Sequence, residues 1–150
     1  MAVDWDRRVK GLRASGPSVI LDSNFLFVPK RFNVDIFEEM RRLLGANVRF
    51  FVPRPVITEL HLLRHGATPS ATREIDFALS LVETCEVLEE GLPDNELVDD
   101  FISRIALEKG YSVATNDREL RRHLRASGVQ VVYLRQRTHL EVEGLQRNPY

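Results

Sequence analysis

The sequence lacks the features that would place it in a membrane or among disulfide-stabilised secreted proteins. Its only cysteine, Cys85, has no partner within the 150 residues, so an intrachain disulfide is excluded and a small buried thiol is expected. No apolar run approaches the length of a membrane span, and the opening MAVDWDRRVKGLRASG lacks the apolar core of a signal peptide. We therefore expect a soluble, cytoplasmic protein with no membrane partner.

The sequence also lacks an excess of charge of either sign. Its formal net charge is -1, so global charge gives no reason to expect a polyanionic partner. Any case for nucleic acid binding must rest on local clusters. With 43% hydrophobic residues and no internal repeat, low-complexity segment or linker, the chain is expected to form a single domain over residues 1–150.

Short apolar runs alternate with longer amphipathic segments along the chain. The apolar runs predict strands at residues 18–22, 48–53, 86–90, 111–117 and 129–135. The amphipathic segments predict helices within residues 33–45, 54–66, 71–85, 94–110 and 118–128. Asn33 is expected to cap the first of these helices, and Asp94 or Asn95 the fourth. This alternation predicts an α/β three-layer sandwich, in which helices cover both faces of a central parallel sheet of four to five strands.

Carboxylates stand at strand ends and helix starts in this predicted layout. They are Asp22, Glu59, Asp99, Asp100 and Asp117. The carboxyl ends of parallel strands and the starts of the following helices meet at one edge of the sheet. Carboxylates gathered there repel one another unless a cation lies among them, and Mg²⁺ or Mn²⁺ prefers such oxygen ligands. Each acid alone could instead be a turn or cap residue, and only their convergence favours a site.

Helix geometry separates the two adjacent acids. The apolar stripe of their helix consists of Val98, Phe101, Ile102 and Ile105. Asp99 lies beside this stripe, three residues before Ile102, whereas Asp100 points further toward solvent. We therefore expect Asp99 to be the better metal ligand and Asp100 to play a supporting role.

Four short segments, in this order, carry a family resemblance. They are ILDSNFL (20–26), VITEL (56–60), DDFISRIALEKG (99–110) and VATND (113–117). Together they resemble PIN domains (PilT N-terminus-like), a family of metal-dependent nucleases, from about residue 19 to residue 140. Ser23 stands where the family signature has threonine. The pattern is most similar to archaeal members related to the endonucleases of small-subunit ribosomal RNA processing. It is also similar to toxins of toxin–antitoxin pairs.

The resemblance implies an endoribonuclease that hydrolyses RNA phosphodiester bonds with Mg²⁺ or Mn²⁺, leaving a 5′-phosphate and a 3′-hydroxyl. The implied catalytic metal ligands are Asp22, Glu59, Asp99 and Asp117. One or two ions held there would polarise the scissile phosphate and activate water. The residues that would orient ligands or water around them are Ser23, Asn24, Asp100, Thr115 and Asn116. For Ser23, Asn24 and Thr115, local capping of strand ends is the alternative. The family also implies a homodimer and, for a toxin, an antitoxin partner.

Arginines follow the last of the predicted acids directly. Arg118, Arg121, Arg122 and Arg125 share one broad face of a helix. We expect Arg118 and Arg122, together with Arg54, to contact RNA phosphates. Arg121 and Arg125 fit a solvated helix face. The aromatic residues Phe25, Phe27, Phe50 and Phe51 are expected in the core rather than on a base-stacking platform.

Other classes of protein or site fit the sequence less well. A phospho-receiver domain would need paired acids after the first strand and a lysine after the fifth, and a dehalogenase-type phosphatase would need aspartate where Asn24 stands. A zinc site at His61 and His65 would need the glutamate that HLLRH lacks. A catalytically silent PIN domain that binds RNA as a scaffold typically loses acids, and this sequence keeps four.

Overall fold

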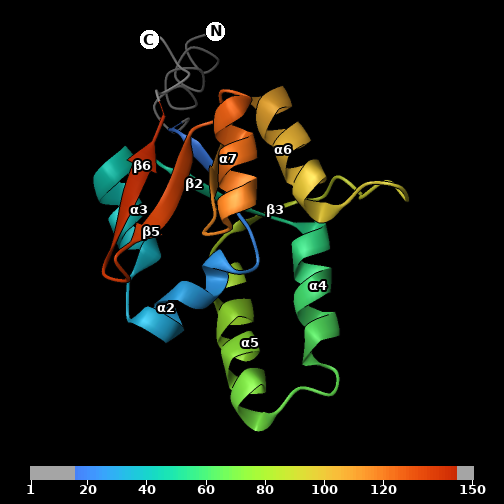
Figure 1. The fold of residues 1–150 in the computed structure, drawn as a ribbon. Coiled ribbons are helices and arrows are strands. Elements are labelled where there is room, and N and C mark those ends of the chain that lie inside the picture. The colour runs from blue at the N-terminus through green and yellow to red at the C-terminus, as the bar shows by residue number, and fades with distance from the viewer. Residues whose placement is uncertain (1–15, 145–150) are drawn as a thin grey trace, which may run out of the picture.

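A computed structural model describes residues 16–144 of the chain. Six strands form one sheet in the order β3-β2-β1-β4-β5-β6, shown in Figure 1. They are β1 (Ser18–Leu21), β2 (Arg49–Pro53), β3 (Glu86–Leu88), β4 (Ser112–Ala114), β5 (Val131–Arg135) and β6 (His139–Glu143). All neighbouring pairs are parallel except β5 and β6, which are antiparallel.

The connections between strands are mostly helical, as the sequence pattern predicts. They are the 3₁₀ turn η1 (Phe25–Phe27) and the helices α2 (Val28–Phe32), α3 (Ile36–Leu44), α4 (Arg54–Arg64), α5 (Pro69–Val82), α6 (Val98–Lys109) and α7 (Arg118–Ala126). No helix within residues 16–144 is both long enough and apolar enough to cross a bilayer. The prediction of a mainly parallel sheet flanked by helices is confirmed.

The order of the strands reverses between β1 and β4, which are hydrogen-bonded neighbours. The chain steps outward from β1 to β2 and β3, then crosses over and steps the other way from β4 to β5. Because such crossovers are right-handed, the helices before and after the reversal cover opposite faces. In Figure 1, α6 and α7 stand in front of the sheet and α3 lies behind it. Ligands of open α/β sheets bind beyond the carboxyl ends of the strands at such a reversal.

The core is built on β1, the strand that lies between β2 and β4. Val19, Ile20 and Leu21 are fully buried, because both faces of the sheet are covered there. The predicted core positions Phe25, Phe27, Phe50 and Phe51 are all buried, which confirms their assignment. Truncation of such a buried aromatic side chain to alanine typically costs about 3–5 kcal/mol.

The sheet has one strand more than the four to five predicted. The extra strand, β6, returns from β5 through a tight turn in which Gln136 and Arg137 have φ values of 54° and 62°. The N–H of Thr138 donates to the carbonyl of Arg135 at 3.1 Å and closes the turn. Two successive positive φ values define the hairpin turn that Asn-Gly normally signals, and this sequence has neither residue there. The sequence therefore contains no recognisable motif for this hairpin turn.

Two predicted helix caps were wrong. Asn33 ends α2 in the left-handed conformation, with φ 55°, and Asp35 caps α3 by accepting a hydrogen bond from the Glu38 N–H at 3.1 Å. Neither Asp94 nor Asn95 caps α6, which begins only at Val98. Residues 93–96 form a turn of their own instead, closed by a backbone hydrogen bond of 3.0 Å between its first and last residues.

Candidate active site

Asp22 lies at the junction of β1 and β4 and is only 5% exposed. Its Oδ1 accepts a hydrogen bond from the Phe25 N–H at 2.9 Å, and its Oδ2 accepts one from the Thr115 hydroxyl. Its own N–H donates to the Ala114 carbonyl, the last residue of β4, at 3.3 Å. Burial raises the pKa of Asp22 to about 7 against the opposing effect of its two hydrogen bonds. The carboxylate is therefore rigidly placed and costly to ionise.

The loop from Thr115 to Asp117 is fixed to the strands beside it. The Thr115 N–H donates to the carbonyl of Val132 at 3.0 Å, and the Thr115 Oγ1 accepts from the Asp117 N–H at 3.1 Å. Asn116 accepts a hydrogen bond from the Leu134 N–H of β5 at 2.9 Å through its Oδ1. The predicted orienting residues Thr115 and Asn116 thus hold the loop that positions Asp117.

Asp117 has two roles in the structure. It is the N-cap of α7, where its Oδ1 accepts from the Leu120 N–H at 3.0 Å. Its charge also contributes to the raised pKa values of Asp22 and Asp99. The cap and the site assignments considered from the sequence are therefore compatible, because one carboxylate oxygen remains for other contacts.

Glu59 and Asp99 reach the same space from two helices. Glu59 lies in α4. Its Oε1 accepts a hydrogen bond at 3.2 Å from the hydroxyl of Ser23, the residue that follows Asp22. Asp99 is the second residue of α6. Desolvation is the main cause of the raised pKa of Asp99, and the charges of Asp117, Glu59 and Asp100 raise this pKa further. The structure thus gathers these acids at the carboxyl edge of the sheet.

The oxygen donors of this cluster fit Mg²⁺ or Mn²⁺ in their chemistry. Both ions favour carboxylate oxygen and retain water, and a cation would offset the burial and the repulsion that raise the pKa values of Asp22 and Asp99. The carboxylate side chains do not form a complete coordination shell, however. Within residues 16–144, no three histidine, cysteine, aspartate or glutamate side chains lie close enough together to hold one ion.

Two predicted orienting residues lie at the rim. Asn24 is exposed, and its side chain makes no hydrogen bond within the described part of the chain. Asp100 is also exposed and lines a groove between α6 and α7 beside Asp99. The structure therefore ties Ser23, Thr115 and Asn116 to the acids and strands, but leaves these two side chains facing solvent.

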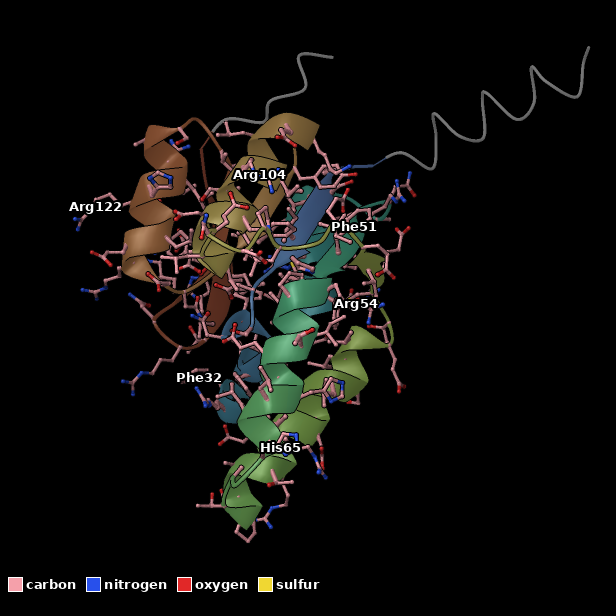
Figure 2. The ribbon with its side chains drawn as sticks, turned by 90° about the vertical axis from the view of Figure 1, so that its right-hand side faces the viewer. Phe32, Phe51, Arg54, His65, Arg104 and Arg122 are labelled. Atoms are coloured by element: carbon pink, nitrogen blue, oxygen red, sulfur yellow. The ribbon has the colours of Figure 1, made fainter. Side chains whose placement is uncertain are left out.

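The predicted phosphate-binding arginines differ in their surroundings. Arg54 makes a two-pronged ion pair with Glu89, with distances of 3.1 and 2.8 Å, so a phosphate would have to displace that carboxylate. Arg118 and Arg122 are exposed on α7 and have no ion pair among the described residues. Figure 2 shows Arg54 and Arg122 on opposite sides of the view.

Two hollows flank the acids, and sequence reasoning missed both. A groove of about 510 Å³ between α6 and α7 includes Asp99 and Arg122, and Leu97 at its edge is 72% exposed. An apolar hollow of about 460 Å³ lies on the other side, where Glu59 faces Leu92 from the loop before α6. An isolated exposed leucine in a loop gives no periodic signal, so only the structure reveals these hollows.

The doubly wound sheet, with carboxylates gathered where its strand order reverses, defines an α/β domain with an acidic candidate site. The sequence profile described as a PIN-like domain matches residues 19–137, and the chain belongs to the PIN-like domain family. The resemblance seen in the four sequence segments is thereby confirmed.

Several solved structures are similar to this one. The PIN domain endonuclease Utp24 is 27% identical with a TM-score of 0.71, and the similarity covers 86% of this chain and 92% of that one. A domain of a functionally unknown protein from Methanocaldococcus jannaschii DSM 2661 shares the fold at 16% identity, with a TM-score of 0.57 and coverage of 86% and 98%. No curated protein sequence gives a significant match.

Proposed function

We propose that this protein is a metal-dependent endoribonuclease that acts in RNA processing, with ribosomal RNA as the favoured substrate. The observation that carries the proposal is the convergence of Asp22, Asp99 and Asp117 at the reversal of strand order. Burial raises the pKa values of Asp22 and Asp99, and the charge of Asp117 raises both further. Membership of the PIN-like family and similarity to a PIN domain endonuclease support it.

The acids would bind Mg²⁺ or Mn²⁺, with Asp22 as the rigid ligand and Asp99, Glu59 and Asp117 around it. The ion would supply Lewis acidity at the phosphodiester and make water a stronger acid. Thr115 would hold the Asp22 carboxylate in place through its hydrogen bond, and Ser23 would do the same for Glu59. The exposed acids Asp99 and Asp100 would face the incoming strand.

Single-stranded or looped RNA fits this edge of the sheet better than a regular duplex. Proteins that read such strands combine cationic contacts to phosphates with space for unstacked bases. Arg118 and Arg122 would contact phosphates, since no carboxylate among the described residues neutralises them. Arg54 would do so only by exchanging its Glu89 partner for a phosphate.

A homodimer is part of the proposal, and the exposed apolar residues of two helices support it. Leu62 and Leu63 on α4 are 65% and 50% exposed, and Phe77 on α5 is 40% exposed. On α3, Ile36 and Met40 are buried within the domain, whereas Leu43 is 36% exposed. Sedimentation that finds only a 17.3 kDa species at tens of micromolar would argue against pairing.

The test of the proposed function is cleavage of a labelled, structured RNA by the purified protein, with manganese, magnesium or chelator present. We expect metal-dependent internal cuts with 5′-phosphate ends. Cleavage that persists in chelator would refute the metal-carboxylate mechanism. Tight RNA binding with no cleavage under any condition would favour a silent scaffold. Neutralisation by a small protein encoded beside this one would favour the toxin-type alternative.

A further inference from the structure

Four arginines on α7 form a cationic surface next to the acids. The α7 arginine face consists of Arg118, Arg121, Arg122 and Arg125, and together with Glu143 of β6 it lines a hollow of about 420 Å³. Arg122 also lines the groove between α6 and α7 that includes Asp99. Because Arg122 belongs to both hollows, they adjoin and form one track leading from the acids across α7.

The α7 arginine face is less neutralised than several other arginines of the described surface. Arg49, Arg64 and Arg104 each make ion pairs of 2.7–2.9 Å with neighbouring carboxylates. On α7, Arg118 and Arg122 make none within residues 16–144. The other two arginines, Arg121 and Arg125, share one carboxylate at longer distances.

Glu143 lies 3.6 Å from Arg121 and 4.0 Å from Arg125, measured from carboxylate oxygen to guanidinium Nε. These distances are long for a charge-assisted hydrogen bond, and all three side chains are roughly a third to a half exposed. Within α7 itself the acid is Glu119, which lines the groove on the α6 side. Four guanidinium groups therefore face one loosely paired carboxylate in this hollow.

The two paired arginines are held in place by contacts other than Glu143. The Arg121 guanidinium lies over the Tyr133 ring, 4.2 Å from its centroid, and the Arg125 Nη1 donates to the Val129 carbonyl at 3.2 Å. Glu143 itself is fixed on β6 by pairing with Val131. Removal of the Glu143 charge should therefore free both guanidinium groups without displacing them.

We propose that the α7 arginine face binds consecutive phosphates of an RNA strand as the strand leaves the acidic site. Glu143 occupies the position of a phosphate on Arg121 and Arg125, and so limits the affinity for RNA. This inference rests on the proposed function. Along the helix axis, Arg118, Arg122 and Arg125 are spaced by ~6 and ~4.5 Å, a repeat that suits an extended polyanion. Arginine is the side chain best matched to phosphate oxygens, which it can bind in pairs.

The experiment measures equilibrium binding of a labelled single-stranded oligoribonucleotide to the full chain in chelator, between ~50 and ~200 mM salt. We expect Arg122→Ala to weaken binding and to reduce the slope of log K against log salt by about 0.7, the value for one lost phosphate contact on a single strand. We expect Glu143→Gln to tighten binding about two- to fivefold, the size of an exposed ion pair, with the gain shrinking at high salt.

Each variant has a control with the same change of charge. Arg73→Ala removes an exposed α5 arginine that has no ion pair among the described residues. Glu86→Gln, on β3, the edge strand opposite β6, frees Arg49 of β2. The inference is overturned if Glu143→Gln binds RNA no more tightly than Glu86→Gln, or if Arg122→Ala behaves like Arg73→Ala.

Three further outcomes distinguish failure of this inference from failure of the proposed function. Metal-dependent RNA cleavage by the wild type, together with RNA affinity that is unchanged in both Arg122→Ala and Glu143→Gln, would overturn the inference alone. Absence of both RNA binding and RNA cleavage in the wild type would overturn the proposed function as well. Binding of polyglutamate that depends on Arg122, together with RNA binding that does not, would assign the face to an acidic protein partner and overturn the inference.

Discussion

The hydroxyl of Thr115 donates a hydrogen bond to the carboxylate of Asp22, although the two residues are 93 positions apart in the sequence. The bond spans the junction of β1 and β4, where Leu21 pairs with Ala114 one residue earlier on each strand. The same hydroxyl oxygen accepts the Asp117 N–H at 3.1 Å. The relative position of two acids is therefore set by the register of the sheet rather than by flexible loops.

Replacing Thr115 with valine should damage both stability and the site. The change leaves the Asp22 Oδ2 and the Asp117 N–H without this partner at a buried position, at a cost of about 1–3 kcal/mol in the free energy of unfolding. It should also raise the pKa of Asp22 further, because the lost bond lowers it. Urea unfolding measures the first effect. Thr115→Ser keeps the hydroxyl and should remain close to wild type, so equal losses in the two variants would contradict this assignment.

The buried Asp22 carboxylate should make the metal-free protein less stable as pH rises. Its pKa is near 3.8 in the unfolded chain and about 7 in the folded one, so between these values the unfolded state releases a proton that the folded state retains. The stabilising contribution is complete below pH ~4 and is lost as pH rises through ~7. Asp22→Asn should therefore melt at a higher temperature than wild type at pH 8, with the difference vanishing near pH 4.

Asp76→Asn serves as the control for that comparison, because Arg64 lowers the pKa of Asp76. Its contribution to stability has the opposite sign: it is present above the usual aspartate pKa and is lost as pH falls. The variant should show no gain in melting temperature at pH 8. A gain equal to that of Asp22→Asn would show that the effect is not specific to the buried site.

Added manganese should raise the melting temperature, since an ion bound to the native acids stabilises the native state by linkage. The response should be smaller in Asp22→Asn and in Asp99→Asn, because an amide offers the ion no negative charge. Asp94→Asn, an exposed change in the loop before α6, should respond like wild type. Equal metal-induced shifts in all four proteins would rule out binding at the proposed acids.

The β5–β6 hairpin offers a test of the fold that is independent of function. Arg137 has φ 62°, a conformation that costs a residue with a side chain about 1 kcal/mol relative to glycine. Arg137→Gly should therefore stabilise the protein by about that amount in chemical denaturation. Thr138→Gly, one position further on and not at positive φ, should not stabilise it. A loss of stability in Arg137→Gly would mean that the turn differs from the one described.

The sequence predicted the central part of the fold and the gathering of its acids. Parallel strands buried on both faces appear as apolar runs, as with Val19, Ile20 and Leu21, and a polar residue directly after such a run marks the edge of the sheet. Asp22 and Asp117 could be placed for that reason. Glu59 and Asp99 followed from helix starts, because helices after parallel strands begin at the same edge.

Features that depend on tertiary contacts could not be predicted. The ion pair between Arg54 and Glu89 joins residues 35 positions apart and carries no local signal. Glu143 lies on an edge strand whose turn lacks the usual residues, so its position opposite Arg121 and Arg125 appears only in the folded chain. The contacts of Glu143 explain why the arginines of α7, which share one helix face, differ in their partners.

The central claim is that the gathered carboxylates perform metal-dependent RNA cleavage. The most direct measurement is the single-turnover rate of cleavage of a labelled RNA in manganese by wild type, Asp99→Asn and Asp94→Asn, each shown to be folded. We expect Asp99→Asn to lose orders of magnitude in rate because a neutral amide cannot offset the charge of the ion, whereas Asp94→Asn retains the wild-type rate. Cleavage by Asp99→Asn at the wild-type rate would contradict a metal-carboxylate mechanism.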